Sequence, residues 1–523
     1  MELPDITRAR VSSKKTPNLD EFRLRNFLDK LDRHGELLYN DDPVELIDIA
    51  RLLESDPRAI CFRNIGARGE QLVGNVMATR KRLALALNIP DRKLLVELRR
   101  RLANPIAPIE VAPSDAPVQE IVWEGKDVDL TRLPIHLQHT RDGAPYISSS
   151  LDFSTEPETG RTNVGCRRIM PIGRAIASVD MNAPSDFRAA FLKSIAAKRS
   201  MPVAFAIGSH PADFIGSQIL LPASDELALI GGVRGSAVPV VRCRTIDQFV
   251  AADAEIVLEG YIDAAGYVES EGPYGEYLGY YGRLKRNPLF RITAITMRKD
   301  AIFQTVTIGG KSLANTDTAQ LVALRTEAAV WTALEATIRE PVAVYSAPAS
   351  GGMFNVRFSM RPRYAGEVRN ALAAVLACPA DVKHAFATDP DIDVFSDDQI
   401  EWALATRFQV ERDLLVMTGM RAFPLDPSLD GAKLGSKAGF DLTVPFGAGD
   451  NPEFSVPDTP RFVAAKTAAT VEEALTRCPQ TFFELMVALG TQDGRDILRS
   501  FDDLRAKGRL KRLDDGKYAL KDA

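Results

Sequence analysis

The sequence predicts an α/β protein assembled from several domains. Its 523 residues are more than one hydrophobic core usually organises. The helix and strand patterns also change along the chain, from mixed α/β to mainly β and back to alternating α/β. We therefore expect an α/β (α+β multidomain) fold with domains at 19–115, 116–315 and 316–455, followed by a small winged-helix-like appendage at 476–523.

The N-terminal domain is predicted from a helical periodicity that begins at Leu19. Apolar residues recur there mostly at three- and four-residue steps, the spacing of one helix face: Phe22, Leu24, Phe27, Leu28 and Leu31. A short strand at 59–64 and helices near 80–87 and 92–102 complete a small α/β domain. Pro105, Pro108 and Pro113 then mark a linker into a different kind of sequence.

The central domain is predicted to be mainly β. Residues 147–153 and 162–170 form two strand-like runs separated by a Pro/Gly turn, which is typical of a hairpin. Further strands are expected at 254–262 and 289–297, and inserted helices at 185–198 and 211–219.

Alternating helices and strands return from Thr316 and predict the C-terminal α/β sandwich. Helices are expected at 321–336, 367–376 and 400–406, and strands at 342–346, 354–358 and 384–388.

The tail has the element order of a winged helix. Helices at 481–489 and 494–507 precede a hairpin, 508–513 and 517–520, that turns at an Asp-Gly pair. A basic patch accompanies it, made of Lys507, Arg509, Lys511 and Arg512. We favour a packing or dimerisation appendage on an enzyme over a DNA-reading module, because short motifs of this kind often arise by chance.

Composition argues against several classes of protein. Lys and Arg number 65 against 70 Asp and Glu, so the net charge of −5 offers no global field for nucleic acid. No apolar stretch approaches the roughly 20 residues of a membrane-spanning helix, and the N-terminus lacks a signal-peptide pattern. The five cysteines form no CxxC pair, which argues against a disulfide framework or a thiolate zinc site. We expect a cytoplasmic protein whose partners are neither membranes nor nucleic acids.

Two carboxylates close together on a turn are the first candidate for chemistry. Glu271 and Glu276 flank Gly-Pro-Tyr-Gly, so they lie on a tight turn rather than a helix. One carboxyl can hold an arginine, while another in an apolar pocket can have a raised pKa and donate a proton. From this segment alone, two solvated acids on a surface turn remain the favoured interpretation.

The predicted strand at 162–170 carries a second polar pattern. Asn163 and Arg168 are five positions apart, an odd spacing that places their side chains on opposite faces of a regular strand. One can then face a phosphate while the other reaches a substrate carboxylate with its planar fork of donors. A strand whose polar residues simply face water explains this segment equally well.

These two segments belong to a longer ordered series of motifs. The series comprises Thr162–Arg168, Pro211–Ala228, Arg234-Gly235, Ala254–Ile262, Glu271–Glu276, Ile400–Arg407, Leu425–Ser428 and Gly435–Asp441. In this order and spacing the chain resembles the UbiD family of prenylated-flavin decarboxylases, from about Phe22 to Thr443. The resemblance implies a split β-barrel flavin domain in the middle of the chain and a C-terminal domain that dimerises.

The resemblance also implies a reaction and a set of catalytic residues. Family members bind prenylated FMN, which forms a covalent adduct with an unsaturated acid and accepts electrons when CO2 leaves. By this resemblance Glu276 would protonate the carbon that lost CO2, Arg168 would orient the substrate carboxylate, and Glu271 would hold Arg168. A flavin prenyltransferase would supply the cofactor, and decarboxylation of the small acid would be reversible.

A third implication concerns the flavin phosphate, which a divalent, Mn-like ion and a potassium ion help to hold in the family. Asn163 matches a metal ligand and Lys437 a phosphate-binding lysine, while cofactor contacts would also come from Gly165, Cys166, Arg167 and Arg168. The glutamate ligand of the family is expected at Pro239, and a side chain there offers no oxygen to a hard cation. Asp180 or Asp186 could compensate, or Arg167 or Arg174 could meet the phosphate directly.

Three hypotheses for the function follow. The first is a working decarboxylase of aromatic, heteroaromatic or α,β-unsaturated acids, as a homo-oligomer. The second is a flavin-binding or structural subunit of a larger carboxylase assembly, without turnover of its own. The third is a regulator whose tail binds nucleic acid and whose body senses a small acid.

Three further groups of residues have simpler interpretations. His136 and His139 could ligate a metal but are expected to cap or pack, and Cys166 is expected to pack. The acidic run Asp389–Asp393 lacks the spacing of an EF-hand and predicts a loop with a helix cap.

Overall fold

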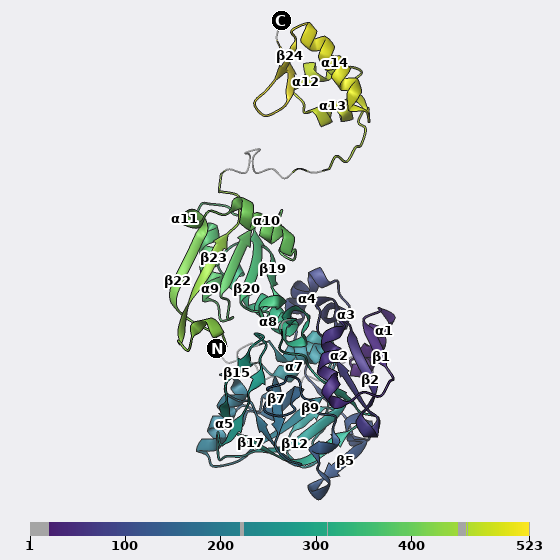
Figure 1. The fold of residues 1–523 in the computed structure, drawn as a ribbon, viewed down its shortest axis with the longest axis vertical. Coiled ribbons are helices and arrows are strands. Elements are labelled where there is room, and N and C mark those ends of the chain that lie inside the picture. The colour runs from purple at the N-terminus through teal and green to yellow at the C-terminus, as the bar shows by residue number, and fades with distance from the viewer. Residues whose placement is uncertain (1–19, 220–223, 311, 448–456, 458, 522–523) are drawn as a thin grey trace, which may run out of the picture. The chain divides into compact units, whose positions relative to one another are not determined.

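The computed structural model describes residues 20–219, 224–310, 312–447, 457 and 459–521, and its contacts divide the chain into two compact units after Thr443 (Figure 1). Parts of the predictions lie outside the described residues: position 19 at the start of the first domain, 220–223 in one motif, 311 in the central domain, 448–455 in the third domain and 522–523 in the appendage.

The N-terminal domain is built on a four-stranded sheet in the order β1-β2-β3-β18. Its last strand comes from the region predicted as central, so the boundary expected at 115 does not separate the two sheets. The strands are β1 (Leu37–Asn40), β2 (Ala59–Ile65), β3 (Glu70–Gly74) and β18 (Ile302–Gln304), and the helices α1 (Leu24–Arg33), α2 (Ile49–Ser55), α3 (Arg80–Ala86) and α4 (Leu94–Leu102).

The central domain is a closed barrel of six strands. The strands run in the order β12-β9-β6-β7-β8-β17, and pairing of β12 with β17 closes the ring. Gly260 permits this closure, because a Cβ there would lie 2.0 Å from the carbonyl oxygen of Arg291. The strands are β6 (Ile147–Thr155), β7 (Thr162–Pro171), β8 (Ile176–Val179), β9 (Met201–Ile207), β12 (Ile256–Ile262) and β17 (Leu289–Met297), with β5 (Ile121–Glu124) added to β17.

Helices and short ladders surround the barrel. The predicted hairpin is confirmed as β6 and β7, and the inserted helices as α5 (Asp186–Ala196) and α6 (Pro211–Ser217), joined by α7 (Glu226–Arg234). The short strands are β4 (Ile109–Glu110), β10 (Pro239–Arg242), β11 (Phe249–Ala251), β13 (Glu269–Glu271), β14 (Tyr274–Gly275), β15 (Tyr281–Gly282) and β16 (Lys285–Asn287). The β13–β16 and β14–β15 pairs carry the turn between Glu271 and Glu276.

The C-terminal domain has a five-stranded sheet in the order β19-β20-β21-β23-β22. Its core lies between this sheet and helices that include α8 and α9. The strands are β19 (Pro341–Ser346), β20 (Asn355–Met360), β21 (His384–Thr388), β22 (Leu414–Arg421) and β23 (Leu434–Asp441), and the helices α8 (Asp317–Glu335), α9 (Glu367–Ala377), α10 (Asp397–Arg407) and α11 (Val410–Asp413).

The second unit contains the tail, which has the predicted order of helices and hairpin and a core of its own. Gln480 forms an isolated antiparallel β-bridge with Tyr518, on the second strand of the hairpin. Its elements are α12 (Val471–Arg477), α13 (Phe482–Leu489), α14 (Gly494–Ala506), β24 (Leu510–Arg512) and β25 (Tyr518–Leu520). Across the described residues of both units, every helix is too short or too polar to cross a lipid bilayer.

Candidate active site

Arg168 on β7 lies at the centre of a buried cluster of carboxylates. Its guanidinium donates two hydrogen bonds to Glu271, from Nε over 3.0 Å and from Nη2 over 3.2 Å. The same group forms ion pairs with Asp180 and Glu276, each at 3.0 Å. Only 10% of the Arg168 side chain is exposed. The structure thus brings together all three residues that the resemblance assigns to catalysis, and adds Asp180.

The turn between the two glutamates is shaped by its glycine and proline. Gly272 has φ of +97°, a conformation that side chains with a Cβ rarely adopt. The backbone is braced from outside, because Gly143 N donates to the Pro273 carbonyl and Gly275 N donates to Asp142. As a result, Glu271 and Glu276 both point toward Arg168 instead of facing water. The solvated-turn interpretation is therefore wrong for this segment.

The charges in this cluster act on Glu276 in opposite directions. Burial raises the pKa of Glu276, and the positive charges of Arg168 and Lys285 only partly oppose that shift. Burial would also raise the pKa of Asp180, but Arg168 and Lys285 outweigh it and lower that pKa to about 2. Burial disfavours the charged form of Arg168, yet its carboxylates hold its pKa well above the usual range. The cluster thus contains a permanent cation and a carboxyl that is easier to protonate than usual.

Two tyrosines form the wall beside the guanidinium. Tyr274 presents its ring 4.5 Å from the Arg168 guanidinium carbon, and the Tyr146 ring packs on Tyr274 with centroids 4.4 Å apart. Burial raises the pKa of both phenols, so both remain neutral near pH 7. This aromatic wall excludes water from one side of Arg168.

A second polar cluster lies on β7 around Asn163 and Arg167. Asp152 is fully buried and accepts hydrogen bonds from Asn163 Nδ2 (2.9 Å) and Arg167 Nε (3.1 Å). Glu226, at the start of α7, accepts a hydrogen bond from the backbone N–H of Val164. Burial raises the pKa of Glu226 to about 8, and the charge of Asp152 adds to that shift.

Glu226 is the residue that sequence reasoning missed in this cluster. The glutamate was expected after Arg234-Gly235, at Pro239, but Pro239 is the first residue of β10 and pairs with Ile109 of β4. Glu226 precedes that motif and begins a helix, so its side chain reaches back to β7. The acidic pair Asp225-Glu226 was the feature of the sequence that could have indicated this contact. In the structure both residues accept hydrogen bonds from the backbone of β7, Asp225 from Thr162 N and Glu226 from Val164 N.

The sequence analysis named Asp180, Asp186 and Arg174 as residues that could compensate for the missing metal ligand. Only Asp186 lies near the Asn163 cluster. Asp186 lies near enough for its charge to raise the pKa of Glu226. Asp180 belongs instead to the Arg168 cluster, and Arg174 pairs with Asp129 with most of its side chain exposed. Within the described ranges, no set of three or more His, Cys, Asp or Glu side chains is arranged to hold a metal ion.

Three further residues that the sequence analysis considered for chemistry, Cys166, His136 and His139, are packed against other parts of the protein. Cys166 is packed beside the core of the first unit, and burial raises its thiol pKa to about 12, so it is no ready nucleophile. His136 is buried, its pKa is lowered to about 4 by desolvation, and its Nε2 contacts Thr305. His139 packs against Gly275, where a Cβ would lie 2.3 Å from its Nδ1.

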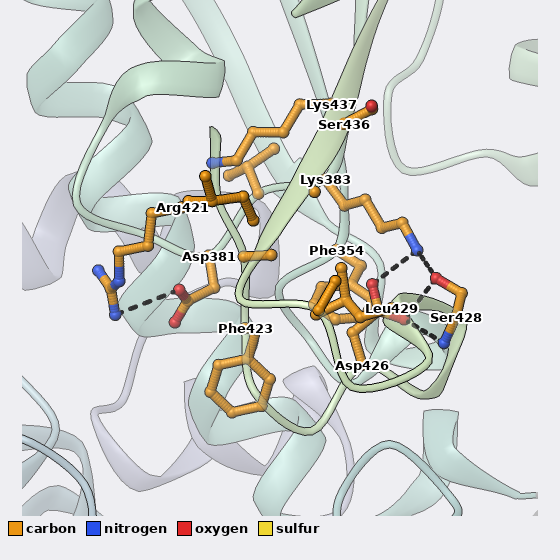
Figure 2. Close-up of a pocket in the computed structure, with 15 residues that line it drawn as sticks. Phe354, Asp381, Lys383, Arg421, Phe423, Asp426, Ser428, Leu429, Ser436 and Lys437 are labelled. Atoms are coloured by element: carbon orange, nitrogen blue, oxygen red, sulfur yellow. Dashed lines mark hydrogen bonds and ion pairs between the residues drawn. The ribbon is translucent and has the colours of Figure 1, made fainter. Parts of the chain in front are cut away.

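Lys437 lines a separate cavity of about 360 Å³ in the C-terminal domain (Figure 2). Its ammonium donates to the carbonyl of Leu376, and every residue lining the cavity comes from that domain. Figure 2 shows Lys383 turned toward Asp426 and Ser428, and Arg421 turned toward Asp381. The structure therefore does not bring Lys437 together with Asn163 and Arg167.

The arrangement of a barrel, a Glu-Arg-Glu cluster and a C-terminal α/β domain matches one family along most of the chain. Residues 28–102, 109–312 and 319–442 match, in order, the N-terminal, Rift-related and C-terminal domains of 3-octaprenyl-4-hydroxybenzoate carboxy-lyase. The chain belongs to the UbiD family. It is accordingly a decarboxylase of the UbiD class, and the matched residues end before the tail.

Similar proteins have names of the same class. The UbiD-class enzyme HmfF from Pelotomaculum thermopropionicum, solved with FMN, is 29% identical with a TM-score of 0.79, covering 84% of this chain and 97% of that one. Vanillic acid decarboxylase (ShVdcCD) from Sedimentibacter hydroxybenzoicus is 28% identical with a TM-score of 0.77, covering 84% and 95%. Anhydromevalonate phosphate decarboxylase from Methanothermobacter thermautotrophicus is 27% identical over 82% of this chain and 98% of its own.

Proposed function

We propose that this UbiD-class enzyme decarboxylates an aromatic, heteroaromatic or α,β-unsaturated carboxylic acid with prenylated FMN, and that Glu276 is the proton donor. The observation that carries the proposal is the position of Arg168, 3.0 Å from both Glu271 and Glu276 in a buried site. HmfF, which has also been solved with prenylated FMN, and the vanillic acid decarboxylase support the substrate and cofactor classes.

Each residue of the cluster has a distinct role in this proposal. Glu271 holds the guanidinium through two hydrogen bonds, so the N–H groups of Arg168 that Glu271 does not use can orient the substrate carboxylate. Loss of CO2 breaks a C–C bond, and the electron pair of that bond ends in a new C–H bond on the same carbon. Glu276 then transfers its proton to that carbon and is reprotonated from solvent. Its raised pKa keeps the proton available for that transfer.

The residues at the Asn163 cluster fit the phosphate end of a flavin accompanied by a cation. Asp152 and Glu226 supply two buried carboxyls against the single charge of Arg167, and this surplus favours a positive ion. A divalent ion bound to a phosphate needs only one or two carboxylates from the protein. We therefore assign Asn163 and Glu226 as oxygen donors to the divalent ion. Gly165 and Arg167, on the same face of β7, are assigned to binding of the cofactor. A potassium ion remains part of this proposal, whereas Lys437, which lines a separate cavity of the C-terminal domain, is not assigned to the phosphate. When bound, the flavin supplies the electron sink for the carbon that loses CO2.

Cofactor content is the first test of the proposal. The chain would be co-expressed with a flavin prenyltransferase, purified without oxygen, and examined by absorption spectrum, ligand mass and metal content. We expect about one prenylated FMN per chain and a divalent ion in the same sample, with turnover of an unsaturated acid. A chain that holds no flavin under these conditions contradicts the proposal.

A second candidate is a flavin-binding subunit of a larger assembly. The form of ShVdcCD solved with a truncated ShVdcD shows that such an enzyme can contain a separate component. The same experiment distinguishes the two candidates, because a subunit would hold flavin yet turn over no acid alone. We place the decarboxylase first because the Glu-Arg-Glu cluster is complete within one chain, and we propose a homo-oligomer formed through its C-terminal domain.

A further inference from the structure

A lysine that sequence reasoning did not select lies beside the proposed proton donor. Lys285 on β16 stands directly opposite Glu271 in the ladder with β13. Its ammonium lies 3.1 Å from Asp180 Oδ2 and 3.8 Å from Glu276 Oε1. The lysine side chain is 25% exposed, whereas that of Glu276 is 4% exposed. Lys285 therefore lies at the edge of the Arg168 cluster, between the buried acid and solvent.

Asp180 joins this lysine to the arginine. The residue directly follows β8, and the same Oδ2 atom contacts both Lys285 and Arg168, at 3.1 and 3.0 Å. With Glu276 protonated, the cluster holds two cations, Arg168 and Lys285, and two carboxylates, Glu271 and Asp180. The four charges balance only in that state, so the cluster as built favours the protonated acid.

We propose that Lys285 and Asp180 are a pair of positioning residues for Glu276: Lys285 draws the Glu276 carboxyl toward the site edge, and Asp180 holds the ammonium and Arg168 in place. The inference rests on the proposed role of Glu276 as proton donor. It adds two residues that act through Glu276 and that need not touch the substrate.

The pair makes opposite contributions to the protonation of Glu276. The groups that face this carboxyl are Arg168, Lys285, Asp180 and Glu271, together with the neutral phenols of Tyr274 and Tyr277. Lys285 favours the charged form of Glu276 and Asp180 disfavours it. A general acid works in its protonated form, so activity is lost as pH rises through its pKa. Removing the lysine charge should therefore move the alkaline limb of kcat/KM to higher pH, and removing the aspartate charge should move it to lower pH.

The test compares Lys285→Met and Asp180→Asn in the flavin-loaded enzyme. We expect the alkaline limb to shift in opposite directions, by about one pH unit or more for Lys285→Met, whose charge lies 3.8 Å from Glu276. Lys285→Arg keeps the charge and should leave the limb near its original position. Lys193→Met is the matched control, since Lys193 also contacts two carboxylates, Glu156 and Glu158, but with 47% of its side chain exposed and away from the Arg168 cluster.

A second readout does not depend on turnover. The infrared carbonyl band of the protonated carboxyl is titrated in substrate-free protein, and Glu276→Gln identifies the band by removing it. The same two opposite shifts are expected in this titration. Shifts in the same direction, or none in either readout, overturn the inference. A Glu276→Gln enzyme that retains normal turnover overturns the proposed function instead, so the two failures are distinguishable.

Discussion

The two faces of β7 carry polar clusters with different balances of charge. On one face Arg168 is matched by Glu271 and Asp180, and Lys285 completes the balance once Glu276 is protonated. On the other face Arg167 meets Asp152, while no ion pair to the nearby carboxyl of Glu226 is formed by the residues that the structure describes, and burial raises the pKa of Glu226 to about 8. The comparison supports our proposal that the Arg168 face is the substrate side, preorganised by the chain itself. The Asn163 face, which we propose as the cofactor side, carries carboxyls suited to a positive ion.

The largest loss of activity is expected when the proposed proton donor, Glu276, is replaced. Glu276→Gln keeps the shape of the side chain but has no acidic proton, so kcat should fall about 100- to 10,000-fold, the usual contribution of a general acid. Flavin content should stay unchanged, because the substitution leaves the Asn163 cluster intact. The measurement is kcat together with the flavin absorbance of the purified variant; a variant that turns over normally would remove Glu276 from the mechanism.

Arg168→Lys tests whether the positive charge alone supports activity or whether the geometry of the guanidinium is also required. A lysine keeps the charge but cannot make the two parallel hydrogen bonds to Glu271. We expect kcat/KM to fall about 100-fold, the scale of a misplaced catalytic group. Steady-state kinetics over a range of substrate concentrations measures the loss, and near-original kinetics would show that the fork is dispensable.

The cofactor side can be tested through stability in protein without flavin or metal. Glu226 has a folded-state pKa of about 8, above the roughly 4.3 expected when unfolded. The folded state then binds more protons, so Glu226 favours folding at low pH and this contribution is lost as pH rises from about 4.3 to 8.

Glu226→Gln should therefore make the Tm of the ligand-free protein less sensitive to pH over that window. At pH 8 and above, the variant should be more stable than the original chain by no more than a few kcal/mol, at ~1.4 kcal/mol per pKa unit. Added divalent ion should stabilise the original chain and not the variant. Thermal melts from pH 5 to 9, with and without Mn²⁺, provide the measurement, and parallel curves for the two proteins would contradict the assignment.

The smallest effect is expected from removal of the second unit. The tail has its own hydrophobic core, and the chain divides into compact units after Thr443. Deleting residues 444–523 should leave both clusters on β7 intact, with kcat/KM changed by no more than about two-fold. Kinetics and size-exclusion chromatography of the shortened chain test this, and loss of the oligomer would instead favour the dimerisation role.

Local patterns predicted much of the fold. The β6–β7 hairpin follows from two strand-like runs and a Pro/Gly turn, and α13 and α14 follow from periodicity and turn residues. The UbiD family, the α/β multidomain fold and the decarboxylase class are confirmed. Glu226 and Lys285 were harder to place, because each reaches its cluster through contacts between segments far apart in the chain.

The sequence by itself determined which groups are available: Arg168, Glu271 and Glu276, in an order that resembles one family. Their contacts were decided by the tertiary structure. Residues 168 and 276 lie far apart in the chain, and barrel closure together with the braced turn brings their charges to 3.0 Å. Tertiary structure also decided that Lys285 joins the Arg168 cluster while Lys437 does not. The physical reason is that spacing along a chain specifies local geometry, whereas burial and charge pairing depend on which distant segments pack together.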